Sequence, residues 1–66
     1  MLKELRKQIV NILKNAPLTI GEAAKLIGIS RMSLSFFLNK EDFVPQVTTI
    51  REYKKFVKKY KKYSED

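Results

Sequence analysis

The turn Gly28-Ile29-Ser30 lies between two short segments with helical apolar spacing, and it most constrains how this chain can fold. The first segment opens at Thr19, and Glu22 follows three residues later, which is the pattern of a capping box. Gly28 can end that helix because a residue without a Cβ adopts positive φ without a clash. Ser30 is a good N-cap for the next helix. The sequence therefore predicts two helices, over about 20–27 and 30–39, joined by a tight turn.

The residues around this turn fit two helices that pack closely at a steep angle. Ala24, four positions before Gly28, is small enough to let the helices approach each other. An ordinary helical hairpin with a Gly cap explains Gly28 and the apolar spacing. It does not explain the small residue, the short turn and the Ser cap together, and this combination favours a DNA-binding helix-turn-helix. The expected buried positions between the helices are Ala23, Ile27, Ile29, Leu34 and Phe37.

Two further amphipathic segments flank this pair. The first is expected to end before Pro17, and its apolar residues recur at steps of three and four: Leu2, Leu5, Ile9, Ile12 and Leu13. After a loop at "FVPQV", Thr48 or Thr49 is expected to cap the last helix, which should fray after Tyr60. We therefore predict an all-α bundle of four or five helices. It forms a single domain over residues 1–66, with a lysine-rich helix and tail from about residue 49 to 66.

Composition narrows the range of possible partners and activities. The chain has 66 residues and a net charge of +7, which favours nucleic acid, a membrane surface or an acidic protein as partner. It contains no Cys and no His, so thiol catalysis, thiolate zinc sites and the usual general base are excluded. We expect no enzyme activity, cofactor, metal or small-molecule substrate. The opening residues "MLKELRKQIV" fit neither a signal peptide nor a membrane span, so we expect a cytoplasmic protein.

The stretch "TIGEAAKLIGISRMSLSFFLN", from Thr19 to Asn39, resembles the helix-turn-helix of lac-repressor-type headpieces. The matching pattern is T-I-x-[DE]-[VA]-A-x-x-x-G-[VI]-S-x-x-[TS]-[VL]-S-x-x-[LIV]-N. The helix before this stretch and "PQVTTI" after it are more similar to Cro/repressor-like (phage-repressor-type) domains. The resemblance implies a lambda-repressor-like fold with the helix over 30–39 in the major groove of DNA.

This binding mode implies specific contacts to bases. Arg31 is the leading candidate for a bidentate contact to a guanine, and the candidate base contacts together are Arg31, Met32, Ser35, Phe36 and Asn39. Phe36 departs from related motifs, which more often carry a polar or basic residue there. Its alternative role is packing against the loop at Phe43 or against a second protein chain. For Met32 the alternative is a solvated or partly covered side chain.

Phosphate contacts are expected to position the protein on DNA. The N-terminus of the second helix carries partial positive charge and could form one clamp. Lys40 and the start of the last helix could form another. The candidate phosphate contacts are Thr19, Gly21, Lys25, Ser30, Ser33, Lys40, Thr48 and Thr49.

The lysine-rich end has two interpretations: a solvated face, or a source of added nonspecific DNA affinity. Aromatic residues interleave with these lysines: Tyr53, Phe56, Tyr60 and Tyr63. One subset of them can fill the core, and those left exposed are candidates for a homodimer surface.

The leading hypothesis is a sequence-specific protein for double-stranded DNA, a transcriptional regulator of repressor type that is nucleoid-associated when bound. One alternative is a DNA-binding module of recombination, packaging or replication. Another is a protein-interaction domain that reuses the fold, such as an antitoxin or an inhibitor of the transcription machinery.

Overall fold

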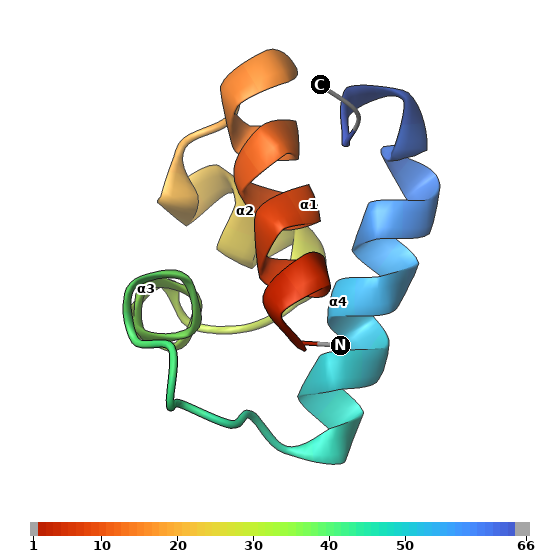
Figure 1. The fold of residues 1–66 in the computed structure, drawn as a ribbon. Helices are drawn as coiled ribbons and strands as arrows, with labels where there is room; N and C mark the ends of the chain where they lie inside the picture. Colours follow the sequence, from red (N-terminus) through yellow and green to blue (C-terminus); the bar gives the residue numbers. More distant parts are fainter. Residues whose placement is uncertain (1, 65–66) are drawn as a thin grey trace.

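A computed structural model describes residues 2–64, which form four α-helices and a short terminal 3-10 turn (Figure 1). The helices are α1 (Leu2–Asn15), α2 (Ile20–Ile27), α3 (Arg31–Asn39) and α4 (Val47–Lys59), and the turn is η1 (Lys61–Tyr63). Residues 2–64 contain no strand. The predicted small all-helical bundle is confirmed. Over the same residues, no helix combines the length and the apolar character that crossing a membrane requires.

The core lies where all four helices meet. α1 packs against α4, α2 packs against α3 and α4, and α3 also contacts α1. In Figure 1, α1 and α4 run lengthwise while α3 is seen end-on, so α3 crosses the other two. The buried apolar residues are Leu5, Ile9, Ile12, Ala23, Ala24, Ile27, Leu34, Phe37, Tyr53, Phe56 and Val57. Ile29 is partly buried and packs against this core.

The predicted capping box at the start of α2 is present. The Oγ1 of Thr19 accepts a hydrogen bond from the amide of Glu22 at 3.0 Å, and Glu22 Oε1 accepts one from the amide of Thr19 at 2.9 Å. At the other end, Gly28 has a φ of 93°. The amides of Gly28 and Ile29 both donate to the carbonyl of Ala24, at 2.8 and 3.0 Å. This left-handed cap ends α2 and turns the chain toward α3.

The third helix begins where the sequence predicts. The Oγ of Ser30 accepts a hydrogen bond from the amide of Ser33 at 3.1 Å, which caps the N-terminus of α3. Leu34 and Phe37 then point inward and are fully buried.

The predicted start of α4 is wrong. The helix begins at Val47, and Gln46 is its N-cap residue. The amide of Ile50 donates to the carbonyl of Gln46 at 3.0 Å, so Thr48 and Thr49 already lie inside the first turn. Pro45 is buried one residue before the N-cap. No side chain caps this helix.

The predicted fraying after Tyr60 is also wrong as far as Ser64. Residues 61–63 form η1, which packs against α1. Asn11 Nδ2 donates to the carbonyl of Ser64 at 3.1 Å, and Asn15 Nδ2 donates to that of Tyr63 at 2.9 Å. These amide side chains, far away in sequence, hold the end of the described chain.

The buried ring of Tyr53 stacks on Phe37 with centroids 4.5 Å apart, but within residues 2–64 no group forms a hydrogen bond with its hydroxyl. Burial raises the pKa of Tyr53 to about 12, because the charged phenolate is poorly solvated there. The core therefore holds a hydroxyl that is not paired with any protein group of residues 2–64.

The two glycines allow a matched test of the turn. Gly28→Ala is expected to lower the free energy of unfolding by about 1–2 kcal/mol, because alanine is strained at positive φ. The cost is conformational, since no atom lies within 4 Å of the added Cβ. Gly21→Ala is the control: the added Cβ meets its nearest atoms at 3.9 Å, so this change should be neutral or stabilising by about 0.5–1 kcal/mol. Urea denaturation measures both, and equal effects would contradict the assigned turn.

Tyr53→Phe tests how the unpaired hydroxyl of Tyr53 affects the free energy of unfolding. At neutral pH the variant is expected to be as stable as the parent or more stable by about 1 kcal/mol, because it removes an unpaired buried polar group. The parent keeps its full stability below the ordinary tyrosine pKa of 10.0 and loses it as pH rises toward the folded value of about 12. The loss attributable to this group is about 1.4 kcal/mol per pH unit in that window.

The measurement is the difference in unfolding free energy between parent and Tyr53→Phe as pH rises above about 10. Lysine titration affects both proteins equally and cancels in the difference. A difference that stays constant with pH would show that Tyr53 is accessible to solvent.

Candidate nucleic-acid interface

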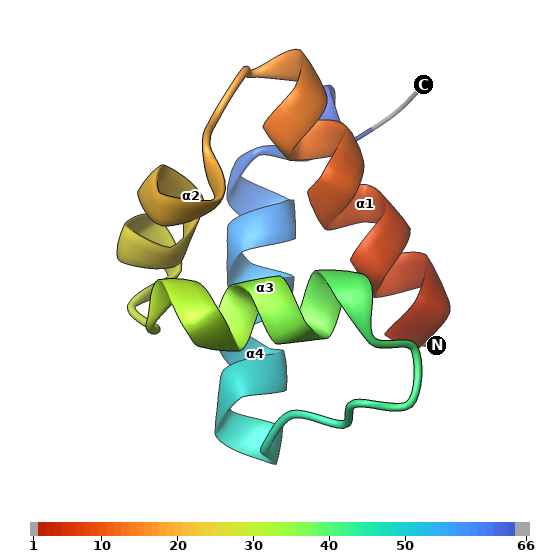
Figure 2. The same ribbon diagram turned by 90° about the vertical axis from the view of Figure 1, so that its left-hand side faces the viewer.

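The third helix has a buried side and an open side. Leu34 and Phe37 are fully buried on the inner side, whereas Met32 is 66% exposed on the outer side. Figure 2 looks onto α3, which runs across the front of the molecule. Arg31, Met32 and Ser35 line a shallow hollow on this outer side. Three of the five predicted base-contacting residues are therefore neighbours on one surface.

The N-terminus of α2 lies beside this surface. A Cβ placed on Gly21 would be 3.9 Å from Cδ of Arg31, so the aliphatic part of Arg31 passes close to Gly21. The same point is 3.9 Å from Oγ1 of Thr19. The tertiary structure thus brings two predicted phosphate contacts next to the leading predicted base contact. Lys25, further along α2, is exposed.

The polar side chains of α3 are partly engaged with one another. Ser30 Oγ donates to Ser33 Oγ at 2.9 Å. Asn39 Nδ2 donates to Ser35 Oγ at 3.2 Å, which leaves the Ser35 hydroxyl proton free for another acceptor. Asn39 is exposed at the C-terminal end of the helix. These contacts within the helix orient Ser35 and Asn39.

Phe36 packs against the loop that follows its helix. Its ring centroid is 6.1 Å from that of Phe43, and the Lys40 ammonium lies 5.1 Å from the Phe36 ring centroid. The predicted alternative, packing on the Phe43 loop, is therefore confirmed. The side chain still remains 40% exposed, so part of the ring faces solvent on the same helix as the hollow.

Arg6 holds α3 in place, and the sequence analysis missed it. Its Nε donates to the carbonyl of Phe37 at 2.7 Å, and its Nη2 donates to that of Glu41 at 3.3 Å. The guanidinium carbon also lies 4.9 Å from the Phe37 ring centroid. Carbonyls near the end of a helix lack intrahelical partners, and an Arg from α1 supplies one here. In the sequence Arg6 only fills a polar position of an amphipathic helix.

The start of α4 shares a hollow of about 320 Å³ with α3 and the intervening loop. Its lining includes Ser33 from α3 and Thr49 and Tyr53 from α4. Thr48 and Thr49 lie in the first turn of α4, where backbone amides without intrahelical partners give partial positive charge. The predicted phosphate contacts Ser33 and Thr49 are therefore close together. Lys40 lies at the C-cap of α3 and Thr48 is exposed.

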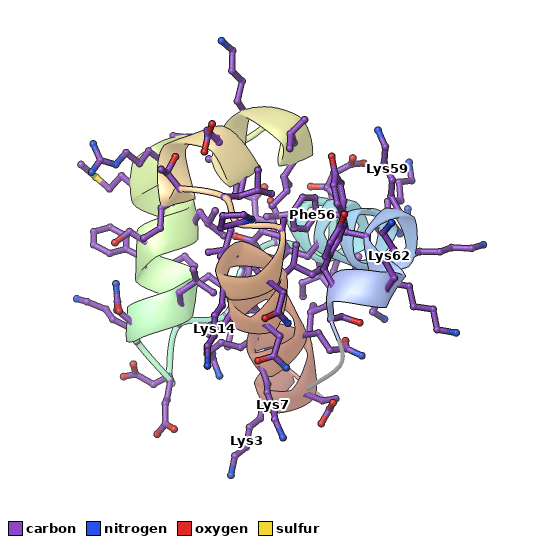
Figure 3. All side chains as sticks on the ribbon, turned by 90° about the horizontal axis from the view of Figure 1, so that it is seen from above. Lys3, Lys7, Lys14, Phe56, Lys59 and Lys62 are labelled. Carbon is purple, nitrogen blue, oxygen red and sulfur yellow. The ribbon has the colours of Figure 1, made fainter. Side chains whose placement is uncertain are left out.

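Positive charge is unevenly distributed around the molecule. The outer side of α3 carries Arg31 and, at the C-cap, Lys40. Figure 3 shows Lys59 and Lys62 on the opposite side of the molecule from α3. All six lysines of α4 and η1 are exposed, as the interpretation of a solvated face expects. Because Lys59 and Lys62 lie on the side opposite α3, they cannot reach a ligand that covers only the outer side of α3.

The predicted dimer surface is wrong for two of its four residues. Tyr53 is 0% exposed and Phe56 is 4% exposed, because both fill the core between α4 and its neighbours. Tyr60 and Tyr63 are half-buried and lie against each other, with ring centroids 6.4 Å apart. A patch that depends on Tyr53 and Phe56 is therefore not available on the folded chain.

Comparisons with protein-family models, with curated proteins and with solved structures found no significant match.

Arg6→Met tests how α3 is held. We expect the free energy of unfolding to fall by about 1–2 kcal/mol, because two carbonyl acceptors lose a charged donor while the apolar stem is retained. Lys3→Met is the control at an exposed position of the same helix, and it should change stability by less than about 0.5 kcal/mol. Thermal denaturation of both variants is the measurement. Equal shifts in the two variants would show that the contacts of Arg6 contribute nothing to stability.

Proposed function

We propose that this protein binds double-stranded DNA sequence-specifically, as a transcriptional regulator of repressor type. The observation that carries the proposal is the position of the outer side of α3. It is exposed at Arg31 and Met32 and lies beside the capped N-terminus of α2. We further propose that α2 and α3 form a helix-turn-helix of the Cro/repressor-like class, and that the protein acts in the cytoplasm.

The size and placement of α3 support insertion into the major groove. An α-helix with side chains is about 10–12 Å wide, and the major groove of B-DNA is about 12 Å wide. In Figure 2, α3 lies in front of the other helices, so its outer side faces away from the rest of the bundle. The inward contacts of Leu34 and Phe37 fix which side chains face outward.

Each outward residue has a role in this proposal. Arg31, at the first position of α3, donates bidentately to a guanine. Ser35 donates its free hydroxyl proton to a base or a phosphate. Met32, the most exposed large apolar residue of α3, contacts a thymine methyl group. Base hydrogen bonding is therefore sparse, and apolar contacts contribute to specificity.

Two helix N-termini position the protein on the phosphates. At α2, Thr19 and the free amides of the first turn face one phosphate, close to Arg31. At α4, the amides around Thr48 and Thr49 face another, and Ser33 lies in the same hollow as Thr49. Lys25 and Lys40 add charge at the edges.

One observation favours a second candidate, a protein-interaction domain. Phe36 remains 40% exposed and Met32 66% exposed, on a helix with few charges. If this side binds a protein, Phe36→Ala abolishes that binding, and DNA affinity is only nonspecific. A DNA-binding module of recombination, packaging or replication would use the same residues as a regulator and differ in where it binds.

Selection of bound sequences from random duplex DNA tests the leading proposal. We expect enrichment of a defined site, and a palindromic site would indicate two protein copies bound to one duplex. Affinity for that site should fall with salt, with a log–log slope near −0.9 for each phosphate neutralised. Absence of enrichment would refute sequence-specific binding.

Arg31→Ala tests the proposed readout. The variant should lose about 1–3 kcal/mol of binding free energy on the selected site and relax specificity at one base position. Lys59→Ala removes one charge on the side of the molecule opposite α3 and serves as the control. Electrophoretic mobility shifts on the selected site and on single-base variants measure both. If Arg31→Ala weakens all sequences equally, Arg31 contacts a phosphate and the readout assignment is wrong.

A further inference from the structure

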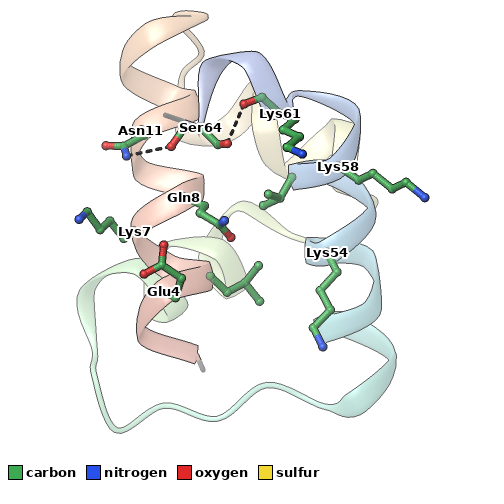
Figure 4. A pocket seen from close by; sticks show the side chains of 10 residues that line it. Glu4, Lys7, Gln8, Asn11, Lys54, Lys58, Lys61 and Ser64 are labelled. Carbon is green, nitrogen blue, oxygen red and sulfur yellow. Dashed lines mark hydrogen bonds between the residues drawn. The ribbon is translucent and has the colours of Figure 1, made fainter. Parts of the chain in front are cut away.

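A groove of about 510 Å³ runs between α1 and the end of the chain formed by α4 and η1 (Figure 4). Leu5 from α1 and Val57 from α4 line it, and both are otherwise buried in the core. Gln8 reaches from α1 toward α4 in Figure 4. The size is within the range of about 300–1,000 Å³ that is usual for binding sites.

Lysines outnumber carboxylates in the lining of this groove. Lys54, Lys58 and Lys61 line the α4 and η1 wall and Lys7 lines the α1 wall. In Figure 4 the side chains of Lys7 and Lys58 extend outward, so their ammonium groups lie at the rim of the groove. The lining contains one carboxylate, that of Glu4. Within residues 2–64 the ion pair found is Lys55 with Glu52, so none of the four groove lysines is in a direct ion pair with a carboxylate.

We propose that this groove binds an acidic peptide segment of a partner protein. Carboxylates of the segment pair with the lysines of the two walls, and one apolar side chain covers Leu5 and Val57. This proposal does not depend on DNA binding by α3. Charge complementarity supports an anionic ligand, and the apolar residues in the lining favour one that also carries apolar side chains.

The shape of the site favours a peptide over a DNA duplex. A duplex is a rigid convex rod that meets a groove at its rim, whereas a single peptide segment can follow the length of a groove. Leu5 and Val57 are 6% and 9% exposed, so the apolar area left to cover is small. A Leu side chain that covers it gains about 25 cal/mol for each Å² removed from water, whereas phosphates gain nothing there. The groove is lined mostly by residues of α1, α4 and η1. In Figure 1, α3 lies on the other side of α1 from α4. A segment in the groove therefore leaves the outer side of α3 uncovered.

The same helix provides a matched control. Lys55, Lys59 and Lys62 form a second stripe with the same spacing as the groove stripe, and none of them lines the groove. Lys55 pairs with Glu52 at 3.4 Å, while Lys59 and Lys62 lie over the rings of Tyr60 and Tyr63. Charge reversals in the two stripes alter the net charge equally but differ in which surface they change.

The experiment measures binding of a short fluorescein-labelled peptide, composed of Glu with Leu at helical spacing, by fluorescence anisotropy without DNA. We expect the double variant Lys54→Glu with Lys58→Glu to weaken binding by about tenfold or more, through the loss of two ion pairs and the gain of two repulsions. The control, Lys59→Glu with Lys62→Glu, should weaken it by less than about threefold, through long-range charge alone. Equal weakening, or no binding to the parent protein, would overturn the proposal.

Gln8 gives a second test that leaves α4 unchanged. Because Gln8 points into the groove, Gln8→Glu should weaken peptide binding and Gln8→Lys should strengthen it, each by a few-fold. A control peptide in which Ser replaces each Leu should bind more weakly than the original peptide, and equal affinity would refute the apolar contact.

Amide chemical shifts and a competition experiment then locate the peptide. Peptide addition should shift the NMR signals of Leu5, Gln8 and Val57 and leave those of Met32 and Ser35 unchanged. Duplex DNA should leave the peptide bound. Displacement by DNA together with shifts of the same three residues would show that the groove is part of a DNA surface, which overturns this proposal. If the parent protein binds the peptide but shows no sequence-specific DNA binding, only the proposed function is refuted.

Discussion

Phe37 is the residue at which three helices meet, and the orientation of α3 depends on it. Its ring is fully buried and stacks on Tyr53 of α4, with centroids 4.5 Å apart. The guanidinium of Arg6 lies near the same ring and also donates to the backbone carbonyl of Phe37 at 2.7 Å. Since ring and carbonyl are both held, rotation of α3 would break an apolar and a polar contact together. This double constraint gives α3 a fixed outer side.

The arrangement that follows separates two surfaces of different chemistry. The outer side of α3 combines one guanidinium, at Arg31, with exposed apolar groups at Met32 and Phe36. Most of the lysines of α4 and η1 lie elsewhere, around the groove with α1 and on the side opposite α3. In a chain of net charge +7 this distribution matters, because exposed charges act mainly within a Debye length of about 8–10 Å. A ligand on α3 and a ligand in the groove would therefore meet different sets of charges.

The parts of the fold that were predictable are those in which the interacting groups are close in sequence. The capping box of Thr19 and Glu22, the cap of Ser30 and the positive φ of Gly28 each depend on groups within a few residues. The start of α4 was mispredicted because Thr48 and Thr49 have the right chemistry for a cap, whereas Gln46 takes the N-cap position without a side-chain hydrogen bond. Aromatic spacing on α4 likewise did not decide which of its aromatic residues, Tyr53 among them, would fill the core.

The sequence by itself determined the helices, their caps and the turn at Gly28, because each arises from hydrogen bonds and steric limits between near neighbours. It also supplied the candidate base-contacting residues on α3. Only the tertiary structure decided that Arg6 holds the C-terminal end of α3 and that Asn11 holds Ser64, which is 53 residues away. It also decided which lysines of one helix line a groove. Contacts between distant residues depend on how the helices cross, and no local pattern of residues encodes that.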